Sequence, residues 1–263
     1  MSAVSPVLRS ELTKLLTSPR VWAVTAVVLA LQSLALAQPL GLVSDAVARI
    51  TPDGVIEVFR GEPEPAEQAI LGLMAGFCLQ SGLFLPLVAA VIGGQEFRNG
   101  QLGLSLLSVP RRGVLVAGKA VVVALYALAL AVVLVALSTF FLYLAVKDWN
   151  PGLLFGAEAL GVHLRFIAFA VLFSLTTLAV TLLARSTLVG VVVTIALVLV
   201  TMSQVFAPDV DALLPMGAAR NLLLDPGADA LAAGPGHGLA VLAGWAVAAV
   251  AVAALAIGRR DAR

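Results

Sequence analysis

Apolar and polar residues follow one another along this chain in long blocks, and the lengths of the apolar blocks indicate membrane-spanning helices. A helix crosses the hydrocarbon core of a bilayer with about 20 apolar residues. The apolar runs cover residues 21–37, 69–93, 117–146, 166–184, 187–206 and 239–257. We therefore expect an all-α integral membrane protein with six transmembrane helices in a single domain.

The segment before the first run, residues 4–18, has the spacing of an amphipathic helix. Its apolar residues recur at helical intervals, at Val4, Val7, Leu8, Leu12, Leu15 and Leu16. Arg9, Thr13 and Lys14 fall largely on the opposite side. This pattern predicts an interfacial helix that lies on the membrane surface with its basic face among the lipid headgroups.

Residues 35–37 offer a second interpretation of the first run. Ala35, Leu36 and Ala37 form the small-residue pattern that a signal peptidase cleaves. The region before the run is long and amphipathic, whereas the corresponding region of a signal peptide is short. We therefore interpret residues 21–37 as a retained span, with cleavage before Gln38 as the alternative.

The basic residues are unevenly distributed among the polar segments, and this distribution predicts the orientation. Placing both termini, residues 94–116 with the adjoining Lys119, and the turn at Arg185 in the cytoplasm puts eleven of the sixteen Lys and Arg residues inside. Residues 38–68 and 207–238, which are acidic and rich in proline, are then extracytoplasmic. This arrangement agrees with the positive-inside rule. Only Arg185 and Ser186 separate the fourth and fifth runs, which predicts a tight helical hairpin.

Composition supports the membrane class and excludes several others. Hydrophobic residues make up 61% of the 263 residues and charged residues 12%, against roughly 25% charged in soluble domains. The mean hydropathy is +1.06. A net charge of +1 gives no sign of a nucleic-acid partner, and the single cysteine, Cys78, excludes an intrachain disulfide. The expected location is the cell membrane.

The central parts of the six runs contain no charged residue, and this absence bears on how the protein could use energy. A transporter driven by protons or sodium usually has a carboxylate or a broken helix near the membrane midplane. The runs offer hydroxyls and amides instead, and these more often hydrogen-bond within the bundle than bind a solute. If the protein moves a solute against a gradient, its energy comes from elsewhere.

Two candidate chemical motifs are weak. Residues 113–119 match G-x-x-x-x-G-K, but Ala120 has no hydroxyl for magnesium and no strand is expected before them, so we interpret Gly118 and Lys119 as a helix start with an interfacial anchor. An intramembrane hydrolase would need a nucleophile beside a base. Ser105 is expected inside, whereas His163 and His237 are expected outside and in no span. We expect no catalytic site, no metal and no cofactor bound by this chain.

The polar stretch GGQEFRNGQLGLSLLSVPRRGVLVAGK, residues 93–119, is the most promising functional segment. It is the one long, charged connection that this topology places in the cytoplasm between two spans. We interpret it as a coupling loop that receives a partner. The alternative is a connector whose basic residues only maintain the topology.

With these features the chain resembles the membrane-spanning permease subunits of ABC-2-type ABC transporters, which are export-type proteins with six spans. The likeness lies in the hydropathy pattern of the whole chain, in SELTKLLTSPR at residues 10–20, and in the loop after the second span. That loop has an acidic, basic and glycine stretch at Glu96, Arg98 and Gly100, then proline and a basic pair at residues 110–112.

The resemblance implies a permease without an ATPase of its own. It implies two permease copies, identical or similar, in the lipid bilayer above separate nucleotide-binding subunits that hold ATP and magnesium. Glu96, Arg98, Arg111 and Arg112 would lie at the surface that docks on the ATPase. It also implies that the segment before the last span folds back as short re-entrant helices, although residues 207–238 are more acidic and proline-rich than that suggests.

Two other classes remain open beside the exporter. A membrane anchor or signalling partner for another complex would share the composition and topology and need no energy source. An intramembrane hydrolase is the less favoured alternative. The sequence does not indicate the transported substrate or whether the permease dimer is homomeric.

Overall fold

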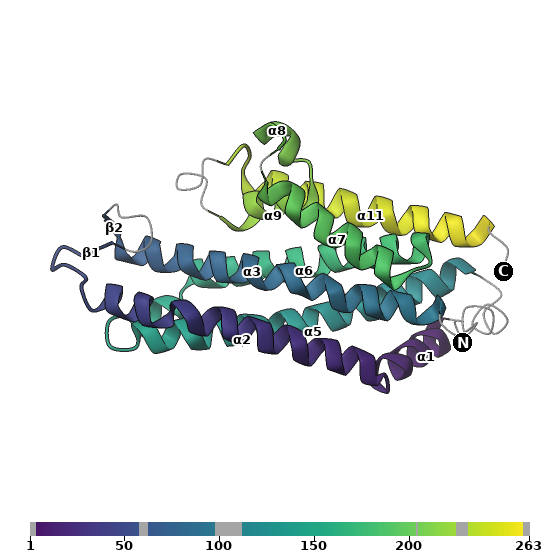
Figure 1. The fold of residues 1–263 in the computed structure, drawn as a ribbon, viewed down its shortest axis with the longest axis horizontal. Helices are drawn as coiled ribbons and strands as arrows, with labels where there is room; N and C mark the ends of the chain where they lie inside the picture. Colours follow the sequence, from purple (N-terminus) through teal and green to yellow (C-terminus); the bar gives the residue numbers. More distant parts are fainter. Residues whose placement is uncertain (1–3, 58–62, 98–111, 204, 225–230, 260–263) are drawn as a thin grey trace.

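The computed structural model is an elongated bundle of helices with one short hairpin (Figure 1), and it describes residues 4–57, 63–97, 112–203, 205–224 and 231–259. The α-helices are α1 (Val4–Leu16), α2 (Pro19–Val47), α3 (Ala66–Gly94), α5 (Arg112–Val146), α6 (Ala157–Ala184), α7 (Thr187–Met202), α8 (Pro208–Asp211), α9 (Pro215–Leu223) and α11 (Pro235–Arg259). The 3-10 helices are η1 (Gln95–Phe97) and η2 (Pro151–Phe155). Strands β1 (Val55–Ile56) and β2 (Glu64–Pro65) pair antiparallel, with Val55 opposite Pro65.

Five of the described helices are long and apolar enough to cross a membrane: α2, α3, α5, α6 and α11. This agrees with the all-α membrane class. The fifth run forms α7, which has 16 residues and ends at Met202 rather than Phe206. At 1.5 Å per residue, α7 is about 24 Å long, shorter than the roughly 30 Å hydrocarbon core of a bilayer.

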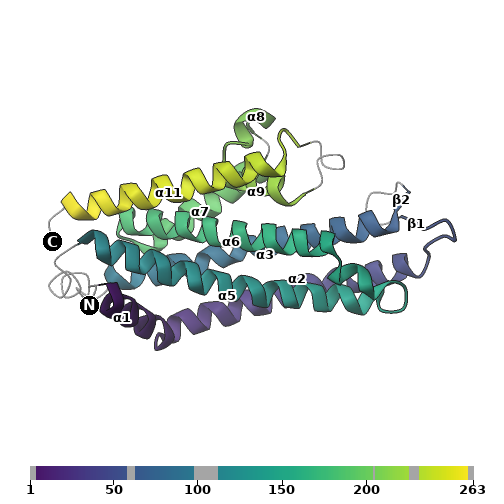
Figure 2. The same cartoon turned by 180° about the vertical axis from the view of Figure 1, so that it is seen from behind.

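The bundle has two distinct ends. The end that we call the N/C end contains α1, η1, the start of α5, the α6–α7 turn and the last turn of α11 (Figures 1 and 2). The opposite end, which we call the hairpin end, contains β1, β2, η2 and the last turns of α2. Helices α3 and α6 pack extensively on each other, and α6 also packs on α5, α7 and α11.

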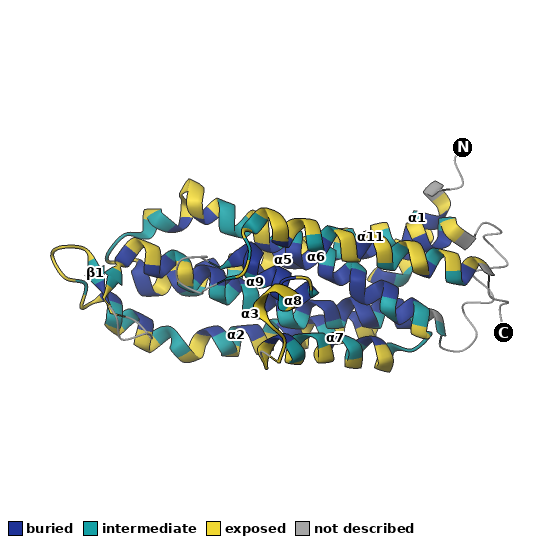
Figure 3. Cartoon of the chain, turned by 90° about the horizontal axis from the view of Figure 1, so that it is seen from above, coloured by how far each residue is buried: buried dark blue, intermediate teal, exposed yellow. Residues whose placement is uncertain are grey.

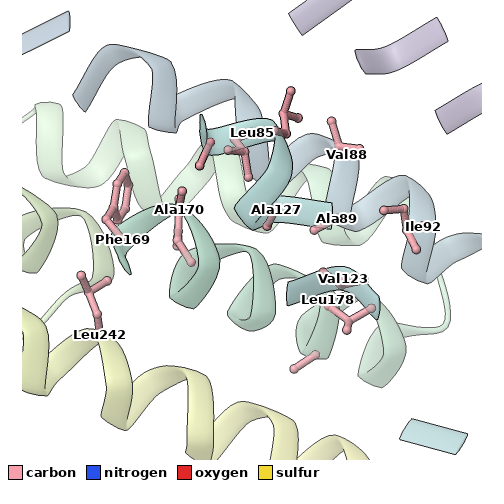
Figure 4. Close-up of a cluster of buried hydrophobic side chains, with 14 of the residues drawn as sticks. Leu85, Val88, Ala89, Ile92, Val123, Ala127, Phe169, Ala170, Leu178 and Leu242 are labelled. Atoms are coloured by element: carbon pink, nitrogen blue, oxygen red, sulfur yellow. The ribbon is translucent and has the colours of Figure 1, made fainter. Parts of the chain in front are cut away.

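The main apolar core lies between α3, α5, α6, α9 and α11 (Figure 4). Phe166, Phe169 and Phe173 of α6 are fully buried, and the rings of Phe169 and Phe173 stack with centroids 5.5 Å apart. Gly82 lets α3 approach this stack, because a Cβ there would overlap the Phe169 ring. Small residues at helix contacts are how membrane helices gain close packing without a hydrophobic driving force between them.

Many residues on the outward surface of the bundle are exposed (Figure 3), and large apolar side chains are numerous among them. Leu34 of α2, Leu188 of α7 and Val247 of α11 are each more than 60% exposed. An apolar outer surface of this extent is unfavourable in water and suits contact with lipid chains.

Helix α1 is present where the amphipathic pattern predicts it, but a different stripe of it is buried. Val7, Glu11 and Leu15, four residues apart, are buried against the bundle, while Leu12 and Leu16 are 44% and 51% exposed. The expected apolar face is therefore divided between the protein and the outside. The acid at position 11 belongs to the buried side.

Helix α2 extends ten residues beyond the expected span, so the predicted acidic loop 38–68 is shorter than expected. Pro39 lies inside the helix, where it removes one backbone hydrogen bond. The extension is stabilised by a second apolar cluster at the hairpin end, in which Val43 and Val47 pack with Ile70 and Met74 of α3. Continued burial therefore outweighs the helix-breaking tendency of proline.

The segment 207–238, expected to be polar and extracytoplasmic, contains a buried helix. Two short helices, α8 and α9, precede α11. Helix α9 packs on α11, α6, α3 and α7, and all of its residues except Arg220 are buried. Asp211, the last residue of α8, lies beside α9, and its Oδ2 is 3.8 Å from Arg220 Nη1.

Candidate functional site at the N/C end

The predicted coupling loop is bounded by helices on both sides, and its middle is outside the described residues. Arg98 and Arg111 lie in residues 98–111, which the structure does not describe. Glu96 is in η1 and Arg112 is the first residue of α5, and their side chains are also outside what is described. The last five residues of the expected range 94–116 are helical, because α5 begins at Arg112.

Helix α1 is seated directly on the start of α5, just after this loop. Gly118 makes the contact possible, since a Cβ there would lie 2.7 Å from Val7 Cγ1. Leu15 of α1 and Val116 of α5 both belong to the main apolar cluster. The interfacial helix is thus packed against the base of the third span.

A buried ion pair joins the same two helices. Lys119 Nζ of α5 lies 2.5 Å from Glu11 Oε2, and Lys14 Nζ lies 2.7 Å from Glu11 Oε1. Glu11 and Lys119 are each 4% exposed. A buried pair of this kind is poor evidence for net stability, but removal of one partner leaves an uncompensated buried charge. The buried ion pair therefore fixes the position of α1 on α5.

This ion pair corrects the expectation for Lys119. The role of Glu11 in it was not predicted. Lys119 is a buried ion-pair partner in the second turn of α5, not an interfacial anchor at a helix start. A signal was present in the sequence, because Glu11 lies four residues from both Val7 and Leu15 and so on their face of a helix. Its partner, 108 residues away, had no local signal.

The other flank of the loop is fastened to the elbow between α1 and α2. Gln95 Nε2 in η1 donates a hydrogen bond of 2.6 Å to Ser18 Oγ, the residue before α2. Trp22 Nε1 donates to the Leu16 carbonyl at 2.9 Å across the same elbow. Trp22 is half exposed, as an aromatic residue at a membrane interface would be.

The expected hairpin between the fourth and fifth runs is present beside this elbow. Arg185 adopts the left-handed conformation, φ 51° and ψ 32°, and ends α6. Ser186 then begins α7, and its Oγ accepts a 3.4 Å hydrogen bond from Val189 N. Helix α3 reaches this turn closely, since a Cβ at Gly94 would overlap the Thr187 side chain. The ends of α2, α3, α5, α6 and α7 therefore meet at the N/C end.

The G-x-x-x-x-G-K match does not have the backbone of a phosphate-binding loop. Residues 113–119 are helical throughout, so they form no phosphate-binding loop. The described residues contain no group of three or more His, Cys, Asp or Glu side chains that could hold a metal ion. Ser105 lies outside the described residues.

The histidines were expected outside the spans, and both lie within helices that are longer than the apolar runs. His163 is in α6 and His237 in α11, near the starts of two candidate spans. His163 Nε2 lies 3.2 Å from Thr139 Oγ1 of α5, on the wall of a cavity of about 610 Å³ between the two helices.

Most intramembrane hydroxyls have the structural role expected for them. Thr25 Oγ1 lies 2.5 Å from the Tyr126 hydroxyl, joining α2 to α5, and Thr177 lies 3.1 Å from Thr194, joining α6 to α7. Gln32 differs: it is fully buried in α2, and neither atom of its amide has a hydrogen-bond partner in the part of the chain that is described.

Taken with the apolar outer surface, the five long apolar helices place this chain in the class of helical, multi-pass membrane proteins. No protein-family model and no curated protein matches the sequence.

Proposed function

We propose that this chain is the membrane-spanning permease subunit of an ATP-driven exporter of the ABC-2 type. Two copies, identical or similar, form the substrate path in the cell membrane, and both termini face the cytoplasm. ATP and magnesium are bound by separate nucleotide-binding subunits, which dock on the loop that contains Glu96, Arg98, Arg111 and Arg112.

The observation that supports this proposal most strongly is the attachment of both flanks of that loop to one rigid unit. On one side, Gln95 bonds to Ser18 at the start of α2. On the other side, Lys119 of α5 pairs with Glu11 of α1. A force applied to the loop would therefore move the ends of α2, α3 and α5 together. A loop that only maintained topology would need no such attachments.

The mechanism follows from this connection. Closure of the ATPase subunits on ATP pushes on the loop and tilts the helices whose ends meet at the N/C end. Helices α2, α3 and α7 correspond to spans one, two and five, and Gly94 and Thr187 bring α3 into direct contact with the start of α7. The tilt opens a path outward at the interface between the two permease copies.

The test is affinity purification of the tagged protein in mild detergent, with assay of the eluate for ATPase activity and for a soluble subunit. The double variant Arg111→Glu, Arg112→Glu should lose the co-purifying ATPase while membrane insertion is retained. The matched control is Arg49→Glu, Lys147→Glu, which reverses two charges that follow α2 and α5 at the hairpin end. This control should keep the ATPase.

Two outcomes would oppose the proposal. If the wild-type chain purifies without any ATPase, it is a membrane anchor or signalling partner rather than a permease. If the Arg111 and Arg112 variant inserts in the wrong orientation, which accessibility of a tag at the C-terminus reports, these residues maintain topology and do not form a docking surface.

A further inference from the structure

The cavity that has His163 on its wall lies between α5 and α6, which run side by side (Figure 2), and η2 closes one end of it. Its volume of about 610 Å³ is within the usual range for small-molecule sites. Along α5 the lining residues extend from Val132 to Tyr143, which is about 16 Å at the helical rise of 1.5 Å per residue. The cavity is therefore elongated, and it lies in the half of the bundle next to the hairpin end.

Most of the lining is apolar and much of it is exposed. Phe140 of α5, Phe155 of η2 and Leu160 of α6 are each more than half exposed, whereas Leu154 and Thr139 are buried at the base of the cavity. The described lining residues include no aspartate, glutamate, lysine or arginine. A lining of this kind favours an occupant that is apolar and carries no charge.

His163 and Thr139 give the cavity a polar point. His163 Nε2 lies 3.2 Å from Thr139 Oγ1, so one of the two ring nitrogens has a partner. The other nitrogen, Nδ1, has no hydrogen-bond partner among the residues that the structure describes. His163 is six residues inside α6, and lipid chains offer no hydrogen-bonding group at such a position. A ligand that bonds to Nδ1 therefore gains free energy that hydrocarbon alone does not provide.

The state of the ring determines which polar group fits beside it. In a neutral imidazole one nitrogen is a donor and the other an acceptor. If Thr139 donates to Nε2, Nδ1 is a free donor; if Nε2 donates to Thr139, Nδ1 is a free acceptor. A hydroxyl group both donates and accepts, so it matches either tautomer. A carbonyl or ether oxygen only accepts, so it matches one.

We propose that this cavity is a binding site for an uncharged lipophilic alcohol. The hydroxyl group bonds to His163 Nδ1, and the hydrocarbon part lies along Val132, Val135 and Ala136 toward the middle of the bundle. A fatty acid fits less well, because no cation among the described lining residues would balance its carboxylate. This site does not depend on the proposed exporter function.

The experiment is photolabelling of the full-length protein in phosphatidylcholine vesicles with a long-chain alcohol that carries a diazirine. Mass spectrometry gives the labelling at Phe140, Tyr143 and Phe155 relative to Leu42, an exposed residue of α2 that serves as the reference for general lipid contact. Excess unlabelled alcohol should suppress labelling in the cavity and leave that of Leu42 unchanged. If it does not suppress cavity labelling, the alcohol contacts the cavity only as bulk lipid does, and the proposal is wrong.

A matched acid tests the preference for an uncharged ligand. The fatty acid of the same length and diazirine position should label the cavity less than the alcohol does, again relative to Leu42. Equal relative labelling by the two probes would contradict an uncharged site.

Variants of His163 assign the binding to its ring. His163→Leu should lower the relative labelling about two- to tenfold, which is the contribution of one neutral hydrogen bond. His163→Gln keeps a neutral donor and acceptor and should recover part of this loss. The control is Thr177→Val, which removes the hydrogen bond to Thr194 between α6 and α7 and should have no effect. Unchanged labelling of His163→Leu would overturn the role of the ring.

A further variant tests the hydrocarbon part of the cavity with the polar point intact. Ala136 lines the cavity and is exposed, so Ala136→Phe adds volume there without disturbing the core. This variant should lower the relative labelling of Tyr143 and Phe155 severalfold. If labelling stays at the level of the wild type, the alcohol does not enter the cavity and the proposal is wrong.

Discussion

The two ends of the bundle are held together by different chemistry. At the hairpin end, α2, α3, α5, β1 and η2 share an apolar cluster that includes Ile56, Ile70, Met74, Leu142 and Leu154. At the N/C end, specific polar contacts supplement the apolar core, chiefly the pairs of Glu11 with Lys119 and Gln95 with Ser18. The energy of apolar packing changes gradually as side chains move. A hydrogen bond or an ion pair, in contrast, is either formed or broken.

This difference suggests a division of roles along the bundle. The hairpin end should stabilise the fold without affecting what docks at the other end. The N/C end should determine both stability and the position of the loop that contains residues 98–111. Substitutions at the two ends can separate these roles, beginning with those of largest expected effect.

The largest effect is expected for Glu11→Ala. It removes the Glu11 carboxylate from the buried Lys119 ammonium, and breaking a buried pair in this way costs about 3–5 kcal/mol. Thermal unfolding in detergent should show a large fall in midpoint, and the ATPase should no longer co-purify.

Two further variants isolate the buried charge as the cause. Lys14→Ala removes the second and more exposed ion pair of the Glu11 carboxylate, and it should cost about 0–1 kcal/mol. Glu11→Leu with Lys119→Met removes both buried charges and should regain most of the stability. A double variant as unstable as Glu11→Ala would show that shape, not the unpaired charge, is responsible.

The second effect is expected at the hairpin end, from Ile70→Ala. Ile70 is fully buried in the second apolar cluster, and large-to-small substitutions of this kind cost about 2–5 kcal/mol. Unlike Glu11→Ala, it should leave co-purification of the ATPase unchanged at temperatures where the protein stays folded. Loss of the ATPase from this variant would end the proposed division between the two ends.

The third effect tests whether α9 is docked as a structural part of the bundle. A Cβ at Gly238 in α11 would meet the backbone carbonyl of Ala218 in α9, so Gly238→Ala should destabilise by about 1–3 kcal/mol. Gly236→Ala is the control in the same helix, because no atom lies within 4 Å of its added Cβ. Equal unfolding midpoints for the two variants would contradict the contact between α9 and α11.

The smallest effect is expected for the interhelical hydroxyl pair between the two ends. Thr25→Val removes the hydrogen bond to Tyr126, and such bonds in membrane bundles average about 0.6 kcal/mol. Tyr126→Phe should have a similar effect, and the double variant should add little to either. A loss of several kcal/mol would mean that polar contacts within the bundle, and not only at the N/C end, dominate its stability.

Hydropathy predicted the helices well because long apolar runs have few other stable structures. The ends of the helices were predicted less well. Helix α2 continues past Pro39 because Val43 and Val47 have partners on α3 and α5, and a pattern read along one segment does not contain its partners. The burial of α9 was not evident from hydropathy for a related reason. Gly217, Ala218 and Ala219 are small rather than strongly apolar, yet they allow close packing.

The candidate site was predicted only in outline. The charged stretch between the second and third spans indicated where to look. The contacts that hold its flanks, from Glu11 to Lys119 and from Ser18 to Gln95, join residues 108 and 77 positions apart. Contacts of such separation are set by the three-dimensional arrangement of the helices and leave no periodic signal in a single sequence.

The separation of Glu11 from Lys119 also has a consequence for biosynthesis. The ribosome must add 108 residues after Glu11 before its partner exists. At about 5–20 residues per second, this takes roughly 5 to 20 s. During that interval α1 cannot pack on α5, while the first two long apolar helices are already being made. Closure of the N/C end therefore cannot come before the third long helix has been made.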